Sequence, residues 1–238
     1  MTPLVLLTAF CGLIVDLNPT GPQYPFLDYM APAAMVGKHL EGDNTPNYTV
    51  KTSDSVWIVK AKEGYPWDKN LYDEDGIWAW RTENVWGDPT TYTTWLSMHQ
   101  VLLAPRVVRG GYPGMRWYSC DTRYRPTTNC GQGDRTPSLG GVIINELWGP
   151  YTRTPYMGNL GTFQELTLVY GYGCYPADST VPATEACTSI ETTWWTAEYG
   201  GVWWALYSKV DGVWTMQNHS QSFWVLDGTT SPVFPCDH

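Results

Sequence analysis

The sequence predicts an all-β protein, an irregular antiparallel β-sandwich or barrel with long loops and local disulfides. Aromatic and β-branched runs are broken at short intervals by glycine pairs and Asp-Gly, which is typical of hairpins. Tryptophan (14) and tyrosine (16) are abundant, whereas charged residues make up only 16% of the chain. The 23 glycines and 18 prolines supply many turns, and this composition argues against disorder and against a helical bundle.

The clearest β-meander is residues 190–236, where Gly200-Gly201 and Asp211-Gly212 separate aromatic runs. A two-residue turn at Asp211-Gly212 places Val210 opposite Val213 and Tyr207 opposite Met216. In an unbroken ladder, one face would then hold Trp203, Ala205, Tyr207, Trp214, Met216 and Asn218.

Asn218 conflicts with that pattern, because it begins the sequon Asn218-His219-Ser220 and must reach solvent to be glycosylated. Either the strand ends or bulges near Gln217, or the aromatic face is exposed and presents tryptophans to a partner. We favour the first alternative, in which the meander is a scaffold.

The rest of the chain is expected to contribute shorter elements, in a single domain covering residues 16–238. Residues 16–46 should form an extended arm rather than a helix, and 64–76 a polar loop. Strands are predicted within 48–60 (divided at Ser53-Asp54), 77–81, 92–103, 115–120, 142–148 and 163–172. A short helix at 162–166 competes with the last of these.

Residues 1–15 form an apolar run that is too short to span a bilayer, and we interpret them as a signal peptide. The run has neither a preceding basic residue nor a clear small-x-small cleavage motif, so a buried N-terminal strand is the alternative. A second sequon begins at Asn47. Together these features predict a secreted, oxidised glycoprotein.

The cysteine spacing favours two local disulfides, Cys120–Cys130 and Cys174–Cys187. If Cys11 leaves with the signal peptide, Cys236 remains unpaired or pairs outside this chain.

No motif predicts catalysis, a metal site or a cofactor. The four histidines lack metal-ligand spacing, and the acidic run Asp73-Glu74-Asp75 is read as a solvated loop. The tryptophans are expected mostly in the core, although an exposed ridge could bind sugars. A net charge of −9 makes nonspecific nucleic-acid binding a poor candidate.

Residues 101–155 differ from the rest, because they hold seven arginines against three acids. This segment is either a solvated face or a partner-binding patch. Arginine and tyrosine are enriched at binding hot spots, and a disulfide would hold the loop rigid. The candidate contact residues are Arg116, Arg123, Tyr124, Arg125 and Arg135; an ordinary stapled turn is the alternative.

Several short motifs follow one another in a familiar order: Tyr24-Pro25-Phe26, Ser53 to Ile58, Tyr118 to Cys130, Cys174-Tyr175-Pro176, and Phe223 to Cys236. In this order the chain resembles the surface subunit of betaretrovirus-like (endogenous retrovirus K group) envelope glycoproteins. It departs from them after Asp227, where Gly228-Thr229 replaces the usual Trp-Ala-Pro. Because the chain stops at His238, we expect a receptor-binding fragment or a truncated, host-captured envelope product.

The resemblance implies non-catalytic binding of a host cell-surface receptor, with a fusion (transmembrane) subunit as partner in the parent envelope. The chain would be extracellular, or attached to a virion or cell surface through that subunit. A soluble form could also block the receptor. The alternative is a secreted carbohydrate-binding or glycoside-hydrolase-like β domain.

Overall fold

The computed structural model describes residues 13–43, 47–51, 57–62, 65–83, 92–94, 101–123, 138–174 and 183–228. These residues are mainly β-strands, and every ladder among them is antiparallel, which confirms the predicted fold class. No helix in these ranges is long and apolar enough to cross a membrane.

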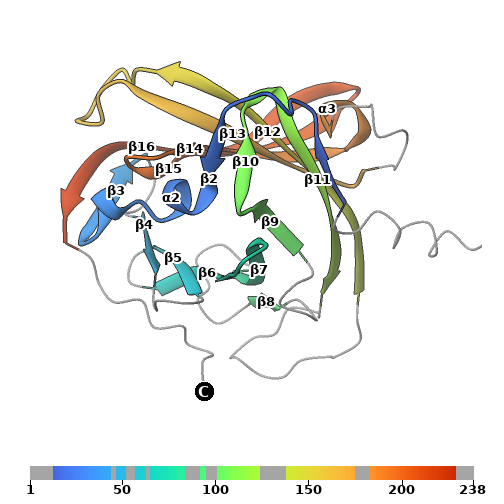
Figure 1. The fold of residues 1–238 in the computed structure, drawn as a ribbon, viewed down its shortest axis with the longest axis horizontal. Coiled ribbons are helices and arrows are strands. Elements are labelled where there is room, and N and C mark those ends of the chain that lie inside the picture. Colours follow the sequence, from blue (N-terminus) through green and yellow to red (C-terminus); the bar gives the residue numbers. More distant parts are fainter. Residues whose placement is uncertain are drawn as a thin grey trace, which may run out of the picture.

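One long sheet contains nearly all of the strands, in the order β1-β11-β12-β13-β14-β15-β16-β3-β4-β5-β6-β7-β8 (Figure 1). Strand β9 pairs with β7, and a separate small sheet joins β10 to β2. The bounds are β1 Ile14–Asp16, β2 Gln23–Pro25, β3 Lys38–Gly42, β4 Asn47–Lys51, β5 Trp57–Lys62, β6 Tyr65–Tyr72, β7 Gly76–Glu83, β8 Tyr92–Thr94, β9 Val101–Pro105, β10 Val107–Arg109, β11 Gly111–Arg123, β12 Ser138–Arg153, β13 Phe163–Tyr172, β14 Ser189–Thr196, β15 Gly200–Val210 and β16 Val213–Asp227.

The sheet folds over so that its two ends face each other, giving two layers. Strand β9, at one end, lies against β11, at the other, where the indole Nε1 of Trp117 and the hydroxyl of Ser119 both donate to the Leu102 carbonyl at 2.9 Å. No backbone ladder joins β9 to β11 within the described ranges, so the arrangement is sandwich-like rather than a closed barrel.

The main core fills the space between these layers. It contains Trp117, Leu147, Leu168 and Trp195 from one layer and Ile77, Leu102 and Ala104 from the other. The short helix α2 (Phe26–Met30) adds Phe26 and Met30, both 1% exposed, and packs against β14 and β15.

Two regular elements contradict the sequence prediction. Residues 65–72 are strand β6 rather than a polar loop, because β5 and β7 pair with it on both sides and leave Asn70 1% exposed. The arm 16–46 is not uniformly extended: it contains α2 and the 3-10 turn η1 (Ala33–Met35), from which Phe26, Met30 and Met35 are buried.

Other predicted strands are confirmed, although some of them are longer than predicted. Residues 163–172 are a strand and not a helix, and the chain is divided into β4 and β5 around residues 52–56, which lie outside the described ranges. Strands β11 and β12 are 13 and 16 residues long, well beyond the predicted 115–120 and 142–148. Pairing between these two strands extends each of them through stretches that contain glycine.

The β15–β16 hairpin has the predicted register at its tip. Val210 pairs with Val213 and Tyr207 with Met216, around a turn in which Asp211 (φ 50°) and Gly212 (φ 80°) both have positive φ. The next pair is Leu206 with Asn218, so Gln217 is the extra residue of a β-bulge.

This bulge resolves the conflict at the sequon. His219, rather than Asn218, comes to lie opposite Ala205 and stacks on Trp203, while Asn218 is exposed. Of the two alternatives, the bulged strand is therefore confirmed.

Candidate functional surface

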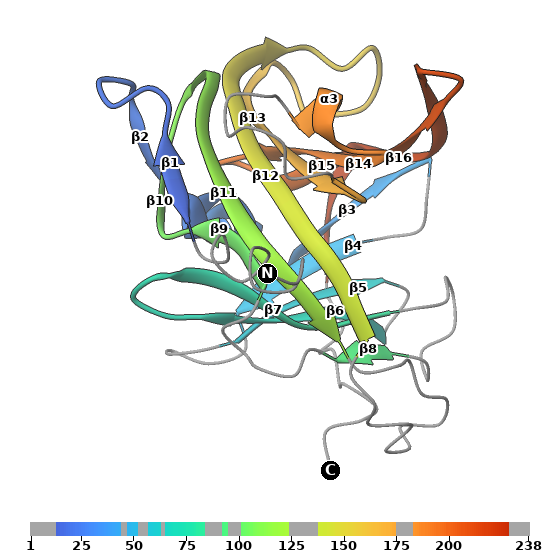
Figure 2. The same ribbon diagram turned by 90° about the vertical axis from the view of Figure 1, so that its right-hand side faces the viewer.

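The β11–β12 hairpin carries the predicted contact segment between its strand ends. Arg123 and Ser138 are Cα partners in the last pair of this ladder. Tyr124, Arg125 and Arg135 fall in residues 124–137, outside the described ranges, as does the side chain of Arg123. In Figure 2 the two strands run side by side from the upper part of the molecule down to β8. The hairpin thus brings both ends of the arginine-bearing segment to one place.

The inner face of this hairpin is held by a buried polar network. Besides the two hydrogen bonds to the Leu102 carbonyl, the Asn145 amide Nδ2 donates to the Trp117 carbonyl and to the Ser119 hydroxyl, both at 3.3 Å. Trp117, Ser119 and Asn145 are each at most 1% exposed. Hydrogen bonds between buried groups fix their relative positions, because breaking them would leave unsatisfied polar atoms.

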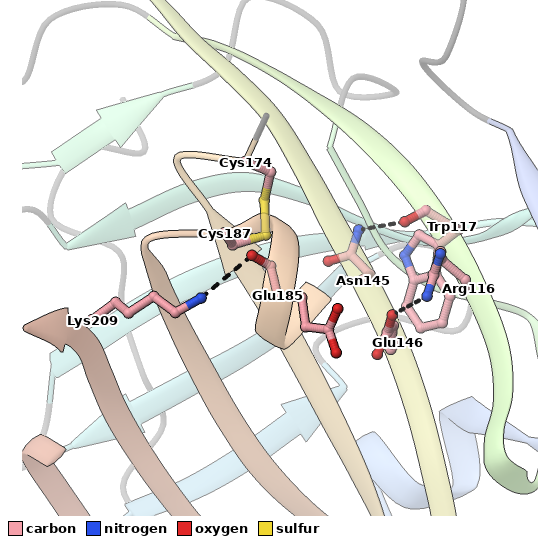
Figure 3. Close-up of a disulfide and its surroundings, with 8 residues drawn as sticks. All are labelled: Arg116, Trp117, Asn145, Glu146, Cys174, Glu185, Cys187 and Lys209. Carbon is pink, nitrogen blue, oxygen red and sulfur yellow. Dashed lines mark hydrogen bonds and ion pairs between the residues drawn. A yellow bond between two sulfur atoms is a disulfide. The ribbon is translucent and has the colours of Figure 1, made fainter. Parts of the chain in front are cut away.

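The outer face of the hairpin is held by a buried ion pair. The Arg116 guanidinium contacts the Glu146 carboxylate through Nη2 and Oε1 (Figure 3). The Trp148 indole donates to Glu146 Oε2 at 3.1 Å. Arg116 is 2% exposed and Glu146 is fully buried. The guanidinium of Arg116 therefore serves the scaffold, and we leave this residue out of the contact surface predicted from the sequence.

The predicted disulfide Cys174–Cys187 is present (Figure 3). It packs in an outer cluster with Tyr118, Ile144, Val169 and Ile190. The short helix α3 (Ala183–Ala186) lies between the two cysteines and contacts β12 and β13. Lys209 Nζ also contacts α3, because it donates to the Glu185 carbonyl at 3.3 Å. The Cys120 side chain, Cys130 and Cys236 lie outside the described ranges, so their pairing stays a prediction.

The other described arginines of the basic segment also have partners within the fold. Arg109 pairs with Asp16, Arg153 pairs with Glu165, and Arg106 lies 5.7 Å above the Tyr72 ring. Burial raises the pKa of the Glu165 carboxyl, an effect that hydrogen bonds from Thr167 and Arg153 partly offset. Much of the positive charge that the sequence concentrates in 101–155 is thus neutralised internally.

A second feature is a row of side chains across the sheet that contact one another through their rings, which we call the aromatic ridge: Tyr112, Tyr151, Arg153, Trp194, Trp203 and His219. Trp194 and Trp203 stack on each other at 4.9 Å with an interplanar angle of 24°. The Arg153 guanidinium covers the other side of Trp194 at 4.4 Å, and the His219 ring lies 5.4 Å from Trp203.

This stacking limits what the ridge can bind. A sugar ring binds tryptophan through the ring face, and protein groups already occupy the faces of Trp194 and Trp203. Sequence patterns gave no signal for Arg153 or His219 as members of the ridge. Arg153 lies on β12, which is separated in the sheet from the β14 strand of Trp194 by β13, and His219 is placed opposite Ala205 by the bulge at Gln217. The side chains of the ridge therefore pack on one another, and the ring faces of Trp194 and Trp203 are not open to a sugar.

The acidic run of the β6–β7 turn is a structural element as well. Asp73 Oδ1 accepts hydrogen bonds from the backbone N–H groups of Asp75 and Gly76 and from the Trp78 indole, at 2.9, 3.1 and 3.1 Å. This is an Asx-type turn, so Asp73 has a structural role that requires no bound ligand. Across the described side chains no group of three or more His, Cys, Asp or Glu residues could hold a metal ion.

The two sequons have different settings. Asn218 is exposed, as glycosylation requires. Asn47 pairs with Leu40 and Lys62 in the backbone of β4, and its side chain lies outside the described ranges. Glycosylation at both positions stays a prediction.

Comparison of the chain with protein-family models, with curated proteins and with solved structures found no match.

Proposed function

We propose that this chain is a non-catalytic binding domain of an envelope-type surface glycoprotein, which recognises a protein receptor on the host cell. The contact would be made by the segment between β11 and β12, through Arg123, Tyr124, Arg125 and Arg135. In the parent envelope, a fusion subunit would be its second partner.

The observation that carries the proposal is the construction of the hairpin base. A polar network holds one face, the Arg116–Glu146 pair holds the other, and the Cys174–Cys187 disulfide packs alongside. A rigid base lowers the conformational entropy lost on binding. The segment that it carries, residues 123–137, holds three arginines and one tyrosine, and both residue types are enriched at binding hot spots.

The direct test is binding of the purified chain to receptor-positive cells, with and without protease treatment of the cell surface. We expect saturable binding that protease removes, and inhibition of entry by a pseudovirus carrying the matched envelope. Arg123→Ala or Tyr124→Ala should each weaken binding by about 1–2 kcal/mol, which is a 5- to 30-fold increase in Kd, with the urea midpoint unchanged.

Arg106→Ala is the matched control, because it removes the guanidinium of an exposed arginine that lies over the Tyr72 ring. It should leave binding unchanged. Absence of saturable binding, or equal losses for Arg106→Ala and Arg123→Ala, would refute the proposal. Protease-resistant binding together with a positive glycan array would support the carbohydrate-binding alternative, and hydrolysis of a glycan substrate the hydrolase alternative.

A further inference from the structure

Strand β16 is paired along both of its edges for only part of its length. Residues 213–221 pair with β15, whereas β3 pairs on the other side from Ser222 onward. Asp43 extends that cover to Gln221, because its backbone N–H donates to the Gln221 carbonyl at 3.0 Å. Among the strands that the structure describes, none pairs with the outer edge of residues 213–218.

The geometry of the hairpin directs backbone groups of this stretch toward the outer edge. In a two-residue hairpin the pair next to the turn, Val210 with Val213, is hydrogen-bonded, and hydrogen-bonded and non-hydrogen-bonded pairs alternate from there. The N–H and C=O groups of Thr215 therefore face β15, and those of Trp214 and Met216 face outward. An added antiparallel strand would meet donors and acceptors at the spacing of a regular ladder.

The side chains of the stretch also suit the addition of a strand. Val213 is 66% exposed and Met216 is 44% exposed, and Thr215 is exposed as well. Proteins commonly protect an open edge with charged residues or proline, and residues 213–218 contain neither. The bulge at Gln217 ends the regular part of the edge.

The edge is complementary to a copy of itself. A two-fold axis at Thr215 places this residue opposite Thr215 of a second copy, and it places Met216 opposite Trp214 of that copy. The outward-facing backbone groups then form hydrogen-bonded pairs. Thr–Thr pairs and contacts between methionine sulfur and an aromatic ring are both favourable. Because the stretch is uncharged, two copies can meet along it without placing like charges opposite each other, although each chain has a net charge of −9.

We propose that the outer edge of residues 213–217 pairs antiparallel with the same edge of a second copy of this chain, and that a glycan on Asn218 prevents the pairing. The register centred on Thr215 places Asn218 opposite Gly212 in the turn of the second copy, so attached glycans would lie at both ends of the interface. The pairing itself is independent of the proposed function, whereas the glycan rests on the secretion that this function requires.

The test measures the mass of the chain by sedimentation equilibrium over a series of concentrations. Wild-type chain secreted by an animal cell line should carry a glycan on Asn218 and stay monomeric. Asn218→Gln removes the sequon and should dimerise with a Kd of about 10–100 µM, as expected for an interface below about 1,200 Å².

Two results would overturn the proposal. One is an Asn218→Gln chain, purified from the medium or from the cells, that stays monomeric well above this concentration range. The other is a wild-type chain that is not secreted, lacks the glycan on Asn218, or dimerises as strongly as the variant.

Charge changes at Thr215 test the register in the Asn218→Gln background. Thr215→Lys and Thr215→Glu each place like charges opposite one another and should raise the Kd about fivefold. A mixture of the two variants places opposite charges across the axis and should restore dimerisation. Thr152→Lys, at an exposed threonine of β12 that pairs with Gln164, is the matched control and should leave the Kd unchanged. Equal effects of Thr152→Lys and Thr215→Lys, or no recovery on mixing, would contradict the pairing.

Folding and receptor binding are measured separately. Thr215 and Thr152 are exposed, so the urea midpoints of their variants should match that of the Asn218→Gln parent. Receptor binding is measured with the monomeric wild-type chain. Its absence would refute the proposed function and would leave the dimerisation result unaffected.

Discussion

The buried ion pair beneath the hairpin gives the sharpest prediction about how this domain is built. Arg116→Met removes the guanidinium and keeps much of the side-chain volume. Glu146, which is fully buried, would then keep the hydrogen bond from the Trp148 indole but lose the positive charge of the guanidinium. A buried carboxylate that loses its cation destabilises the folded state strongly, so the free energy of unfolding should fall by about 3–5 kcal/mol.

The double variant Arg116→Met/Glu146→Leu should behave differently, because it removes both charges and fills the space with apolar atoms. Replacing a buried ion pair in this way is commonly neutral or stabilising, so the double variant should be more stable than Arg116→Met alone. The coupling energy from the full double-mutant cycle should then be about 2 kcal/mol or more.

The assay is urea unfolding followed by tryptophan fluorescence, in which a shift in midpoint at constant slope measures stability. Arg106→Met, which removes an exposed guanidinium above Tyr72, is the control and should cost no more than about 1 kcal/mol. If Arg116→Met costs less than about 1 kcal/mol and instead abolishes receptor binding, the scaffold role assigned to Arg116 is wrong.

Three further predictions concern the surrounding sheet. Cys187→Ser should lower the free energy of unfolding by about 3 kcal/mol, since the disulfide closes a loop with a sequence separation of 13; Cys174→Ser, which opens the same loop, should match it in the same urea titration. Burial raises the pKa of Glu165, so the folded chain keeps a proton that the unfolded chain releases above about pH 4.5, and stability should fall as pH rises from there through the raised pKa. Glu165→Gln should remove that slope in a pH series of urea titrations; an unchanged slope would contradict it. Deleting Gln217 should destabilise the hairpin less than deleting Ser220, because only the first deletion keeps every neighbouring side chain on its present face; equal losses in urea midpoint would contradict the bulge assignment.

Local signals in the sequence were enough to predict several parts of the fold. Asp211-Gly212 adopts the positive φ values that the tight turn requires, and the pairing of Tyr207 with Met216 follows from it. Cys174 and Cys187 are close in the chain, and they are joined as their spacing suggested. Such features depend on residues near one another in sequence, which is why pattern reasoning finds them.

The candidate surface was harder to predict, because its residues gain their roles from distant partners. Arg116 looked like a contact residue until Glu146, thirty positions away, placed it in a buried pair. Residues 65–72 looked like a loop because Asp68, Lys69 and Asn70 are polar, yet neighbouring strands leave Lys69 only 9% exposed and Asn70 1% exposed. Polarity alone predicts exposure only where no tertiary partner is available.

The β-meander shows which features the sequence determines and which are decided only by the tertiary structure. By itself, the sequence determined the all-β class, the turn at Asp211-Gly212, and a conflict at Asn218 that only a bulge or an exposed aromatic face could resolve. Only the tertiary structure decided for the bulge, with Gln217 as the extra residue and His219 on Trp203. The physical reason is that the side chains of a strand alternate strictly, so a single extra residue exchanges the two faces. Where that residue lies depends on the packing of β15 and β16 against the rest of the sheet.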